Sequence, residues 1–578
     1  MEVLSVLKAS CKDCYRCLRH CPVGAIGFGQ DQAWIIKEKC IYCGRCVNIC
    51  PQKAKVPFNG SAELEKFLTS DIPVIASVAP SFVATLELHD YRQLVGGLKE
   101  LGFDYVVETV QGAKYVAKEY FNLVKKWDKP LISTCCPAIV NLVEKHYPEL
   151  IPNLAPLISP MMAHGQILKQ IYGKEVKVVF FGPCIAKIDE LNRPEASGGV
   201  DLVMTFRQLI QFFTKKGVNL EKVEPVDFDL SQSQWPRKYP LRGGVLTTAG
   251  LEEEYLNGQV FSVSGIEDCI QSIADLKEGR IRPIFLELMA CRGGCINGPE
   301  VDINLGVAGR CQLVIKYARD RSKLSFKTKN QKNVEKEVQP AKLRLKREYS
   351  HRKQIYPMPT EEEIREILKR IGKFGKDDET NCGGCGYQTC RDKAIAVYQG
   401  LAEEKMCIPY MKERIESLAH IIVESSHNAI IVVDKNMIIQ EFNPVANQMF
   451  NRKNESPIGQ PLYRYIDPSL FQKVWKEKTR IVHKKVKYEQ YRLVTDQTIF
   501  PIEEYEVIVG IITDITAQEE QKKKVHEMKR MAVEKASAVV HKQMKIVQEI
   551  AKLLGETTVE TKAALYELTE IIEDGDLD

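Results

Sequence analysis

Apolar runs of strand length recur through the first half of the chain, and stretches with the helical spacing of apolar residues separate them. Three of the runs, PLIST, VKVVFF and RPIFLELMA, lead directly into segments that contain cysteine. Strands that alternate with helices predict an α/β domain, and the ends of parallel strands meet at one edge of a sheet. We therefore expect the cysteines behind these runs to converge within an α/β domain of about residues 70–316.

Beyond this domain the pattern of apolar positions changes. Residues 317–372 are strongly charged and predict a linker, which closes with the amphipathic stretch EEEIREILKRIGK. In residues 412–516 two strand-like runs meet at Asp434-Lys435-Asn436, which predicts a β-hairpin.

The last segment, residues 517–578, predicts helix. Its apolar residues are spaced by four and three, as in a seam between two helices. These residues are Val540, Met544, Val547, Ala551 and Leu554. Gly555 interrupts the pattern before a final helix. We expect this segment to dimerise or to pass a signal to another protein.

Composition narrows the class of protein. The 578 residues include 81 Lys and Arg against 76 Asp and Glu, so a net charge of +5 gives no reason to expect nucleic acid. No apolar run approaches the roughly 18 residues that cross a bilayer, and the first residues lack the plan of a signal peptide. We therefore expect a cytoplasmic protein with no membrane segment. In a reducing compartment, its 19 cysteines predict metal ligation or thiol chemistry.

Eight cysteines form two runs of identical spacing, C-x2-C-x2-C-x3-C-P, within residues 1–58. Such runs bind two 4Fe-4S cubanes crosswise, because the fourth cysteine of each run points to the neighbouring cluster. This predicts a first cysteine set of Cys11, Cys14, Cys17 and Cys50, and a second set of Cys40, Cys43, Cys46 and Cys21. The alternative, a pair of zinc knuckles, rarely uses this pattern. The segment resembles a bacterial two-cluster ferredoxin.

A third cysteine set lies within residues 373–411 and consists of Cys382, Cys385, Cys390 and Cys407. Neighbouring glycines allow the backbone to close around a cubane, and we expect a helix from Arg391 to Lys405 to carry the fourth cysteine back to it. The segment resembles the small 4Fe-4S module of the corrinoid iron–sulfur protein family. Zinc is the alternative metal here.

The cysteines behind the three strand-like runs lie in STCCP, GPCIAKIDE and ELMACRGGC. These segments resemble, in the same order, the signatures T-S-C-C-P-x-W, M-P-C-x-x-K-x-x-E and E-x-M-A-C-x-x-G-C-x-x-G-G-G-Q of the iron-only (FeFe) hydrogenases. The resemblance covers about residues 70–312. It implies a central cysteine set of Cys136, Cys184, Cys291 and Cys295, which holds the cubane of the H-cluster. Cys295 would also bridge to a two-iron unit that carries carbon monoxide, cyanide and an amine-containing dithiolate.

The same resemblance assigns roles to further residues. Lys187 is expected to donate to an iron-bound cyanide and Glu190 to orient it, while Ser81 serves the other cyanide. Cys135 occupies the family's proton-relay position, and Met289 belongs to the third signature. The alternatives are an ordinary surface pair for Lys187 and Glu190, and a buried inert thiol for Cys135.

Several positions depart from the family pattern. Ile139 replaces a tryptophan, Gly182 replaces a methionine, and residues 297–300 replace most of a glycine run. A loose alignment of the family's proton-path helix keeps one carboxylate as Glu119 and replaces the next with Asn122. These departures predict an interrupted proton path and slow turnover.

Residues 412–516 resemble a PAS domain, in which the second strand ends in Phe442-Asn443-Pro444 and a short helix carries Ala446 and Phe450. PAS domains are mostly sensory or dimerising modules. His541 lacks a phosphoacceptor box, and the residues after it are too few for an ATP-binding domain, so we expect no kinase activity in this chain.

These resemblances imply a multidomain α/β and α+β protein: a ferredoxin-like domain, an FeFe hydrogenase core, a small 4Fe-4S module, a PAS domain and a helical tail. The first functional hypothesis is a sensor that couples H2 = 2H+ + 2e- to a signalling kinase or phosphatase, as a homodimer through PAS and tail. The second is a metabolic hydrogenase that exchanges electrons with ferredoxin or another carrier, favoured by Cys135 and Met289. The third is a non-enzymatic iron–sulfur scaffold on the same fold.

Overall fold

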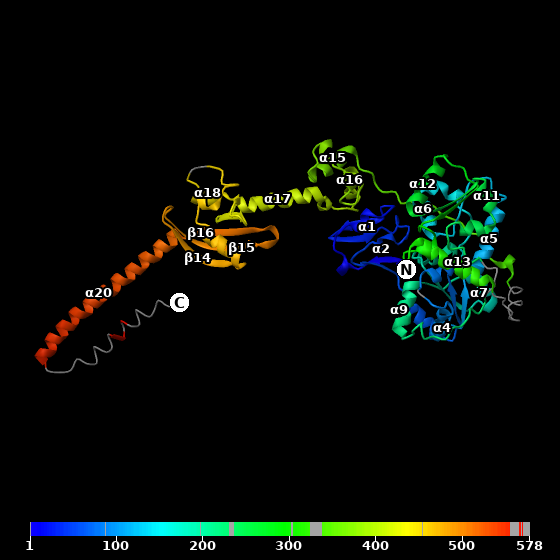
Figure 1. The fold of residues 1–578 in the computed structure, drawn as a ribbon, viewed down its shortest axis with the longest axis horizontal. Coiled ribbons are helices and arrows are strands. Elements are labelled where there is room, and N and C mark those ends of the chain that lie inside the picture. The colour runs from blue at the N-terminus through cyan, green and yellow to red at the C-terminus, as the bar shows by residue number, and fades with distance from the viewer. Residues whose placement is uncertain are drawn as a thin grey trace. The chain divides into compact units, whose positions relative to one another are not determined.

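Two parallel β-sheets form the middle of the chain in the computed structural model (Figure 1). One has the strand order β6-β5-β8-β9 and the other the order β10-β11-β7, and the pairings in both are parallel. The strands are β5 Val74–Val78, β6 Tyr105–Glu108, β7 Leu131–Ile132, β8 Lys177–Gly182, β9 Leu202–Thr205, β10 Val260–Ser264 and β11 Phe285–Met289. The α/β fold and the three strands expected from the apolar runs are therefore confirmed.

Helices link and cover these strands. They are α3 Ser61–Leu68, α4 Arg92–Glu100, α5 Val110–Val124, α6 Pro137–His146, α7 Pro160–Tyr172, α8 Ala186–Leu191, α9 Phe206–Lys216, α10 Gly244–Ala249, α11 Glu252–Leu256, α12 Ile266–Lys277 and α13 Val307–Lys323. Strands β5 and β11 are buried at every residue. Burial on both faces explains why these runs are continuously apolar instead of alternating.

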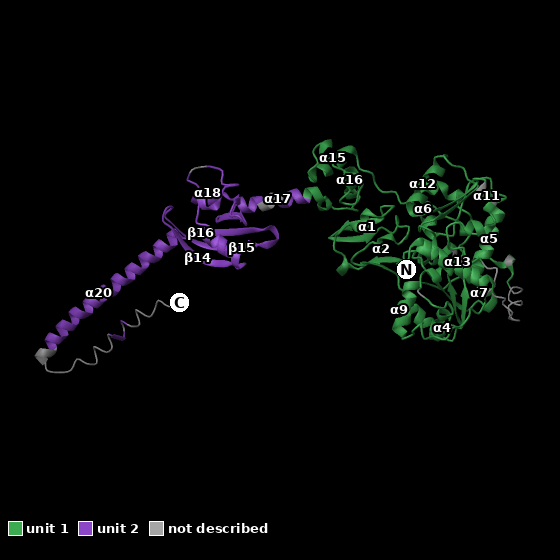
Figure 2. Cartoon of the chain, in the orientation of Figure 1, with its two compact units in different colours: residues 1–410 green, residues 411–578 purple. Residues whose placement is uncertain are grey.

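The structure describes residues 2–578 except 87, 197, 231–235, 302–303, 324–337, 453–454, 555–565, 568 and 570–578. The chain divides into two units, residues 1–410 and residues 411–578 (Figure 2). In the part of the chain that the structure describes, no helix has both the length and the apolar character that a membrane crossing requires. The expected break at Gly555 and nearly all of the helix after it lie outside the described residues.

Short antiparallel pairs build the N-terminal segment. Strand β1 (Leu4–Val6) pairs with β4 (Lys55–Pro57), and β2 (Ile26–Gly29) pairs with β3 (Gln32–Ile35). One short helix lies inside each of the two cysteine runs, α1 at Arg16–Arg19 and α2 at Arg45–Asn48. The two runs thus have the same local structure.

Part of the segment expected to be a charged linker packs against the α/β domain, and residues 324–337 of that segment lie outside the described residues. Within residues 338–352, the carbonyl of Leu345 accepts from the amide of Ile158 at 2.8 Å, and the Tyr349 hydroxyl donates to the carbonyl of Leu157 at 2.6 Å. Charge content alone did not reveal this packing, because the partners of these residues lie far away in the sequence.

The amphipathic stretch at the end of the expected linker forms α15 (Glu361–Arg370), which begins with a capping box at Thr360. It packs against α16 (Cys390–Tyr398), so it belongs to the module of the third cysteine set. Helix α16 is shorter than expected, because Gly400 adopts a left-handed φ of 70° and ends it. A 3-10 turn at Glu404–Met406 then leads to the fourth cysteine.

The C-terminal unit contains an antiparallel sheet in the order β13-β12-β16-β15-β14. Its elements are β12 Ala429–Asp434, β13 Ile439–Phe442, α18 Pro444–Phe450, α19 Ser469–Glu477, β14 Ile481–Tyr488, β15 Leu493–Ile502 and β16 Val507–Asp514. Helix α17 (Ile408–Glu424) precedes the sheet. The expected hairpin is present, and the Asp434 carboxylate accepts from the amides of Asn436 and Ile438 at its turn.

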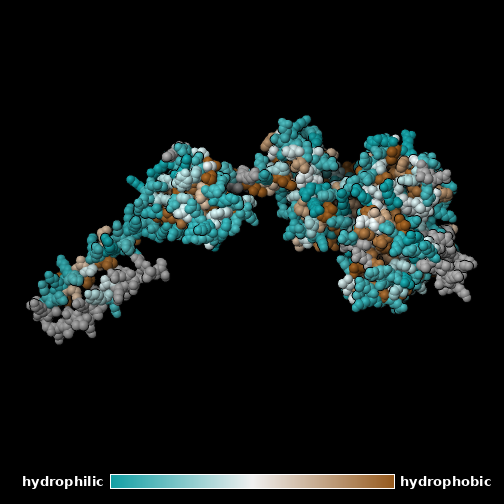
Figure 3. Space-filling view, in the orientation of Figure 1, coloured by the Kyte–Doolittle hydropathy of each residue, from teal (hydrophilic) through white to brown (hydrophobic). Residues whose placement is uncertain are grey.

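Helix α20 (Thr516–Leu554) follows the sheet as a single long helix. Apolar side chains lie exposed along it among charged ones, as the brown atoms within the teal surface of this helix show (Figure 3). Met528, Val539, Ile546 and Ile550 are each more than two-fifths exposed. A helix with such a stripe requires a partner to bury it.

Candidate metal centre

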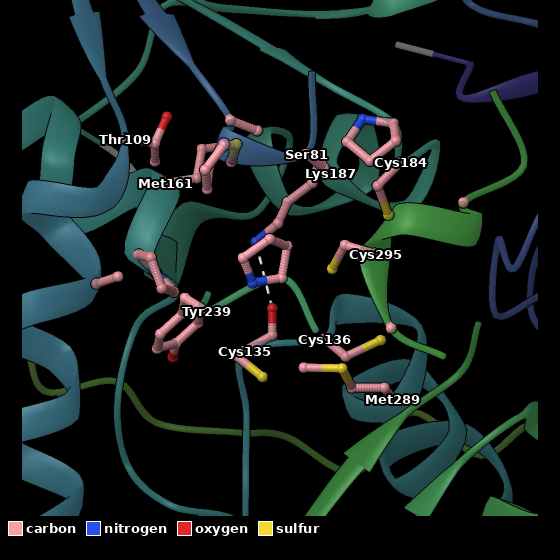
Figure 4. Close-up of a pocket in the computed structure, with 18 of the residues that line it drawn as sticks. Ser81, Thr109, Cys135, Cys136, Met161, Cys184, Lys187, Tyr239, Met289 and Cys295 are labelled. Carbon is pink, nitrogen blue, oxygen red and sulfur yellow. Dashed lines mark hydrogen bonds between the residues drawn. The ribbon is translucent and has the colours of Figure 1, made fainter. Parts of the chain in front are cut away.

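A cavity of about 110 Å³ lies where strands of the two parallel sheets end (Figure 4). Ser81 follows β5, Cys184 follows β8, Cys135 follows β7, and Met289 is the last residue of β11. The cavity is lined by all four cysteines of the central set, namely Cys136, Cys184, Cys291 and Cys295. Segments more than 150 residues apart in sequence therefore converge as the strand-end argument predicts.

Local backbone features aim these cysteines at one space. Cys136 is the N-cap of α6, and Pro137 occupies the first helical position, where a missing amide hydrogen costs nothing. After Cys291 the chain turns back through Gly294, whose φ is 102°. A Cβ at Gly294 would collide with the carbonyl oxygen of Pro240, so only glycine allows Cys295 to reach the cavity.

The charge balance of the cavity fits an iron–sulfur cofactor. Desolvation by the surrounding protein raises the pKa of Cys184 and of Cys295 to about 12, and it raises the pKa of Cys291 well above its usual value, although Cys295 keeps an exposed surface where it lines the cavity. Such thiols become thiolates only beside a strong positive charge, which bound iron supplies. The hydroxyls of Ser81 and Tyr239 also line the cavity, are buried, and have no hydrogen-bond partner among the described residues.

Within the described residues, no three Cys, His, Asp or Glu side chains stand close enough to hold one metal ion together. In a cubane each cysteine binds its own iron, so its ligands stand further apart.

Lys187 is held in the cavity wall by a network of buried groups. Its ammonium donates to the Glu190 carboxylate at 2.7 Å and lies 3.4 Å from the carbonyl oxygen of Cys135. Glu190 also accepts from the Ser159 hydroxyl at 2.9 Å and lies 3.4 Å from the Arg347 guanidinium. Burial alone would raise the pKa of Glu190, but Lys187 and Arg347 outweigh it and hold that pKa below its usual value. The carboxylate is therefore ionised and fixes the ammonium.

Sequence reasoning missed Arg347, which comes from the segment expected to be a linker. Its side chain is 2% exposed, and its amide donates to the carbonyl of Pro156 at 3.1 Å. The sequence signal was weak, because Arg347 stands between Lys346 and Glu348, with Leu345 and Tyr349 two residues away. Nothing local indicates that it reaches Glu190.

Glu119 does not lie in the cavity wall. It is half-buried on α5 and accepts from the Asn122 side chain at 3.3 Å. The neighbouring Tyr120 faces inward instead, and its hydroxyl accepts from the amide of Thr134 at 2.8 Å, directly before Cys135. The two neighbours face different ways because one residue turns the side chain by about 100° around a helix, and the role of Glu119 in a proton path stays a prediction.

The first cysteine set encloses a small hollow with Lys55, and its members Cys11, Cys14, Cys17 and Cys50 all line it. The crosswise grouping is thus the one that the structure brings together. Burial raises the pKa of Cys17, and it raises the pKa of Cys46 in the second set well above the usual value. The Lys55 ammonium opposes both shifts, so its charge acts on both sets.

The third cysteine set surrounds another small hollow, lined by Cys382, Cys385, Cys390 and Cys407 together with Lys393. Lys393 is 1% exposed, and its ammonium donates to the carbonyl of Glu404 at 2.7 Å. Burial lowers the pKa of Lys393, whereas the thiolates of Cys407 and Cys385 raise it. A buried positive charge beside four cysteines matches the needs of an anionic cluster.

Comparison with known families agrees with this arrangement. Residues 72–299 match the family described as "Iron only hydrogenase large subunit, C-terminal domain". This stretch is similar to the large subunit of the iron-only hydrogenases. In this hydrogenase-like chain, residues 4–51 match a 4Fe-4S dicluster domain, residues 378–409 a putative Fe-S cluster segment, and residues 420–507 the PAS fold. The chain is therefore a hydrogenase-like iron–sulfur protein with a PAS domain.

Individual relatives are distant. The chain is 26% identical to iron hydrogenase 1 of Clostridium pasteurianum over 39% of its own length, and it spans only 49% of that protein. It is 27% identical to the periplasmic [Fe] hydrogenase large subunit of Nitratidesulfovibrio vulgaris, with 53% and 88% of the two chains covered. It is also 24% identical to the cytosolic Fe-S cluster assembly factor NAR1 of Yarrowia lipolytica, over 41% and 65%.

Proposed function

We propose that this hydrogenase-like protein binds an H-cluster in the central cavity and senses H2 by reacting with it. The observation that carries the proposal is the pair of Lys187 and the buried Glu190, 2.7 Å apart, beside four convergent cysteines. An iron–sulfur scaffold needs the cysteines but has no use for an aimed ammonium. A ligand such as iron-bound cyanide, with a localised negative charge, gives that ammonium a function.

Four thiolates, Cys136, Cys184, Cys291 and Cys295, would hold the cubane, and Cys295 would be shared with the two-iron unit. When bound, the H-cluster supplies the two-electron chemistry that interconverts H2 with two protons and two electrons. Lys187 and the Ser81 hydroxyl hold its polar ligands, and Met289 keeps that part of the wall apolar and dry.

Cys135 carries the proton. Burial raises its pKa well above the usual value, so the thiol keeps its hydrogen at neutral pH and can donate it to an amine in the cavity. Tyr120, on α5, has its hydroxyl on the amide of Thr134, the residue before Cys135, and burial raises the pKa of that hydroxyl well above its usual value. A phenol that resists ionisation carries protons less readily than a carboxylate does. A path through Tyr120 therefore supports slow turnover. Slow turnover suits a sensor.

The C-terminal unit is the output. The exposed apolar stripe of α20 favours a homodimer, and a PAS domain followed by a long helix favours a kinase or phosphatase as the signalling partner. The reactants are H2 and protons. If electrons leave the chain, ferredoxin or another electron carrier receives them.

A metabolic hydrogenase is the second candidate, because Cys135 and Met289 both line the cavity. One experiment separates the possibilities: anaerobic loading of the full chain with iron, sulfide and a synthetic two-iron cofactor, followed by infrared spectroscopy and H2 uptake. Carbonyl and cyanide bands with slow, H2-dependent turnover support the sensor, and bands with fast turnover support the metabolic enzyme. A chain that is full of 4Fe-4S clusters but shows no such bands contradicts both and favours a scaffold.

A further inference from the structure

One arginine joins the backbone loops of two different cysteine sets. Arg19, the last residue of α1, donates to the carbonyl of Cys14 at 3.0 Å and to the carbonyl of Gly384 at 2.9 Å. Cys14 belongs to the first set, and Gly384 lies between Cys382 and Cys385 of the third set. A planar guanidinium with two donors in fixed directions sets both distance and orientation.

An apolar contact brings the same two loops together. Leu18, next to Cys17, is 6% exposed and packs against Gly386, next to Cys385. A Cβ at Gly386 would overlap the Leu18 side chain, and the φ of Gly386 is 96°. Only glycine permits this approach. The ligand loops of the first and third sets are therefore in direct van der Waals contact.

The rest of the module seats firmly on the N-terminal segment. The amide of Phe28 donates to the carbonyl of Leu401 at 2.9 Å, and the amide of Gln30 donates to the Glu403 carboxylate at 2.6 Å. Two backbone amides of the β2 hairpin are thus satisfied by the module. Such bonds fix the interface more strictly than surface charges do.

A second close contact lies at the other end of the N-terminal segment. Gly44, between Cys43 and Cys46 of the second set, has a φ of 74° and touches Pro299 and Ile185 of the hydrogenase-like domain. Ile185 follows the central-set ligand Cys184 directly. The four sets therefore follow one order in space: central, second, first and third.

We propose that the third set is the electron terminus of this chain, and that Arg19 and Leu18 are the positioning residues that connect it to the first set. The redox step is a transfer of one electron from a reduced cubane at the first set to an oxidised cubane at the third, with no bond made and no proton moved. The contact between the two sets does not depend on the hydrogenase function. The reduction of these clusters by electrons from H2 does rest on that proposed function.

The third set lies at the point in the sequence where unit 1 ends. The fourth ligand of the third set, Cys407, is followed at once by α17, which runs from Ile408 to Glu424. Ile408 lines the hollow of the third set, and its side chain packs on Gly384. An added electron makes the cluster more negative next to the N-terminal end of this helix, where the helix dipole responds to charge.

The test uses the full chain with all clusters reconstituted, and compares Arg19→Gln and Gly386→Val with Arg16→Gln, an exposed arginine one turn earlier on the same helix. The first readout is the magnetic interaction between the reduced clusters, measured by electron paramagnetic resonance after reduction with dithionite. The unaltered chain and Arg16→Gln are expected to show it. Gly386→Val is expected to lose it while keeping its iron content, and a Cys390→Ser variant identifies the signal of the third set.

The second readout is the rate at which the third set is reduced after H2 is added, followed by rapid freezing. We expect Arg19→Gln to slow this step by roughly tenfold or more while the second set fills at an unchanged rate, because a displaced loop lengthens the path. Unchanged interaction and unchanged rate in both Arg19→Gln and Gly386→Val would overturn the proposal. If H2 reduces no cluster in any variant while the dithionite result holds, the electron contact stands and the hydrogenase function fails.

Discussion

The central cavity and the first cysteine set each contain a lysine with little exposed surface, but the two ammonium groups are neutralised in different ways. Lys187 has a protein counter-ion, since Glu190 lies 2.7 Å away and is itself fixed by Ser159. Lys55 is 3% exposed, and its ammonium has no hydrogen-bond partner among the described residues. A buried ammonium without an anion is costly, so Lys55 requires the negative charge of the clusters. The charge of Lys187 is therefore balanced by the protein before a cofactor binds, whereas the charge of Lys55 is balanced only by a bound cluster.

The largest effect is expected from a variant that removes the ammonium of Lys187, which the protein holds in place before a cofactor binds. Lys187→Met leaves Glu190 buried beside Arg347 alone and removes the donor aimed into the cavity. We expect the two-iron unit to bind poorly, with loss of most of the carbonyl and cyanide infrared absorption and a fall in H2 turnover of about 100-fold or more. Lys174→Met, at an exposed lysine of the same domain, is the control. Full infrared intensity in Lys187→Met would mean that the ammonium is structural.

The second prediction concerns the proton. Cys135→Ala should leave the iron content and the infrared bands intact and lower H2 turnover by about 100-fold, since one positioned acid contributes about that much. The matched control is Cys269→Ala, because the Cys269 thiol is also buried but points to the carbonyl of Met289 at 3.4 Å instead of into the cavity. Equal turnover in the two variants would remove Cys135 from the proton path.

For both regions, the sequence predicted the cysteine ligands but not the residues that pack around them. Regular spacing predicted the first and second sets, because their cysteines lie on short local turns. The central set was predicted from strand ends and a family resemblance, since its members are scattered along the chain. Partners brought by long-range packing were not predicted: Arg347 lay in the segment expected to be a linker, and Tyr120 was not singled out as the residue of α5 that reaches Thr134. Neighbouring residues on a helix face different directions, so an alignment that is shifted by one residue changes which side chain points inward. No local sequence pattern reveals such a shift.

A third prediction tests whether a buried carboxylate in the cavity region, that of Glu287, loses its proton as pH rises. Burial raises the pKa of Glu287 to about 7, although its carboxylate accepts from the amides of Gly243 and Leu246 at the start of α10. With a folded pKa above the unfolded one, its contribution to stability is full below about pH 4.5 and is lost as pH rises through 7.

The loss amounts to about 3 kcal/mol over this range. Glu287→Gln should therefore flatten the fall in the free energy of unfolding between pH 5 and pH 8, measured by urea titration. Glu252→Gln, at an exposed position, should keep it. An identical pH profile for Glu287→Gln and the unaltered protein would mean that Glu287 is ionised throughout.

The smallest expected effect comes from the lysine that lacks a protein partner. Reducing a cubane adds one negative charge, so a buried ammonium nearby stabilises the reduced form. Lys55 acts on Cys17 of the first set and on Cys46 of the second, and its loss should disfavour reduction of both clusters together. We expect Lys55→Met to lower each reduction equilibrium constant by about tenfold, which for one electron is about 59 mV.

The measurement is a redox titration followed by electron paramagnetic resonance on the reconstituted full chain. Lys53→Met is the control, because Lys53 is exposed two residues away and removes the same charge where water screens it. A shift confined to one cluster would show that Lys55 belongs to one set only. Equal potentials in Lys55→Met and Lys53→Met would mean that the ammonium of Lys55 is compensated elsewhere, and the contrast with Lys187 would no longer hold.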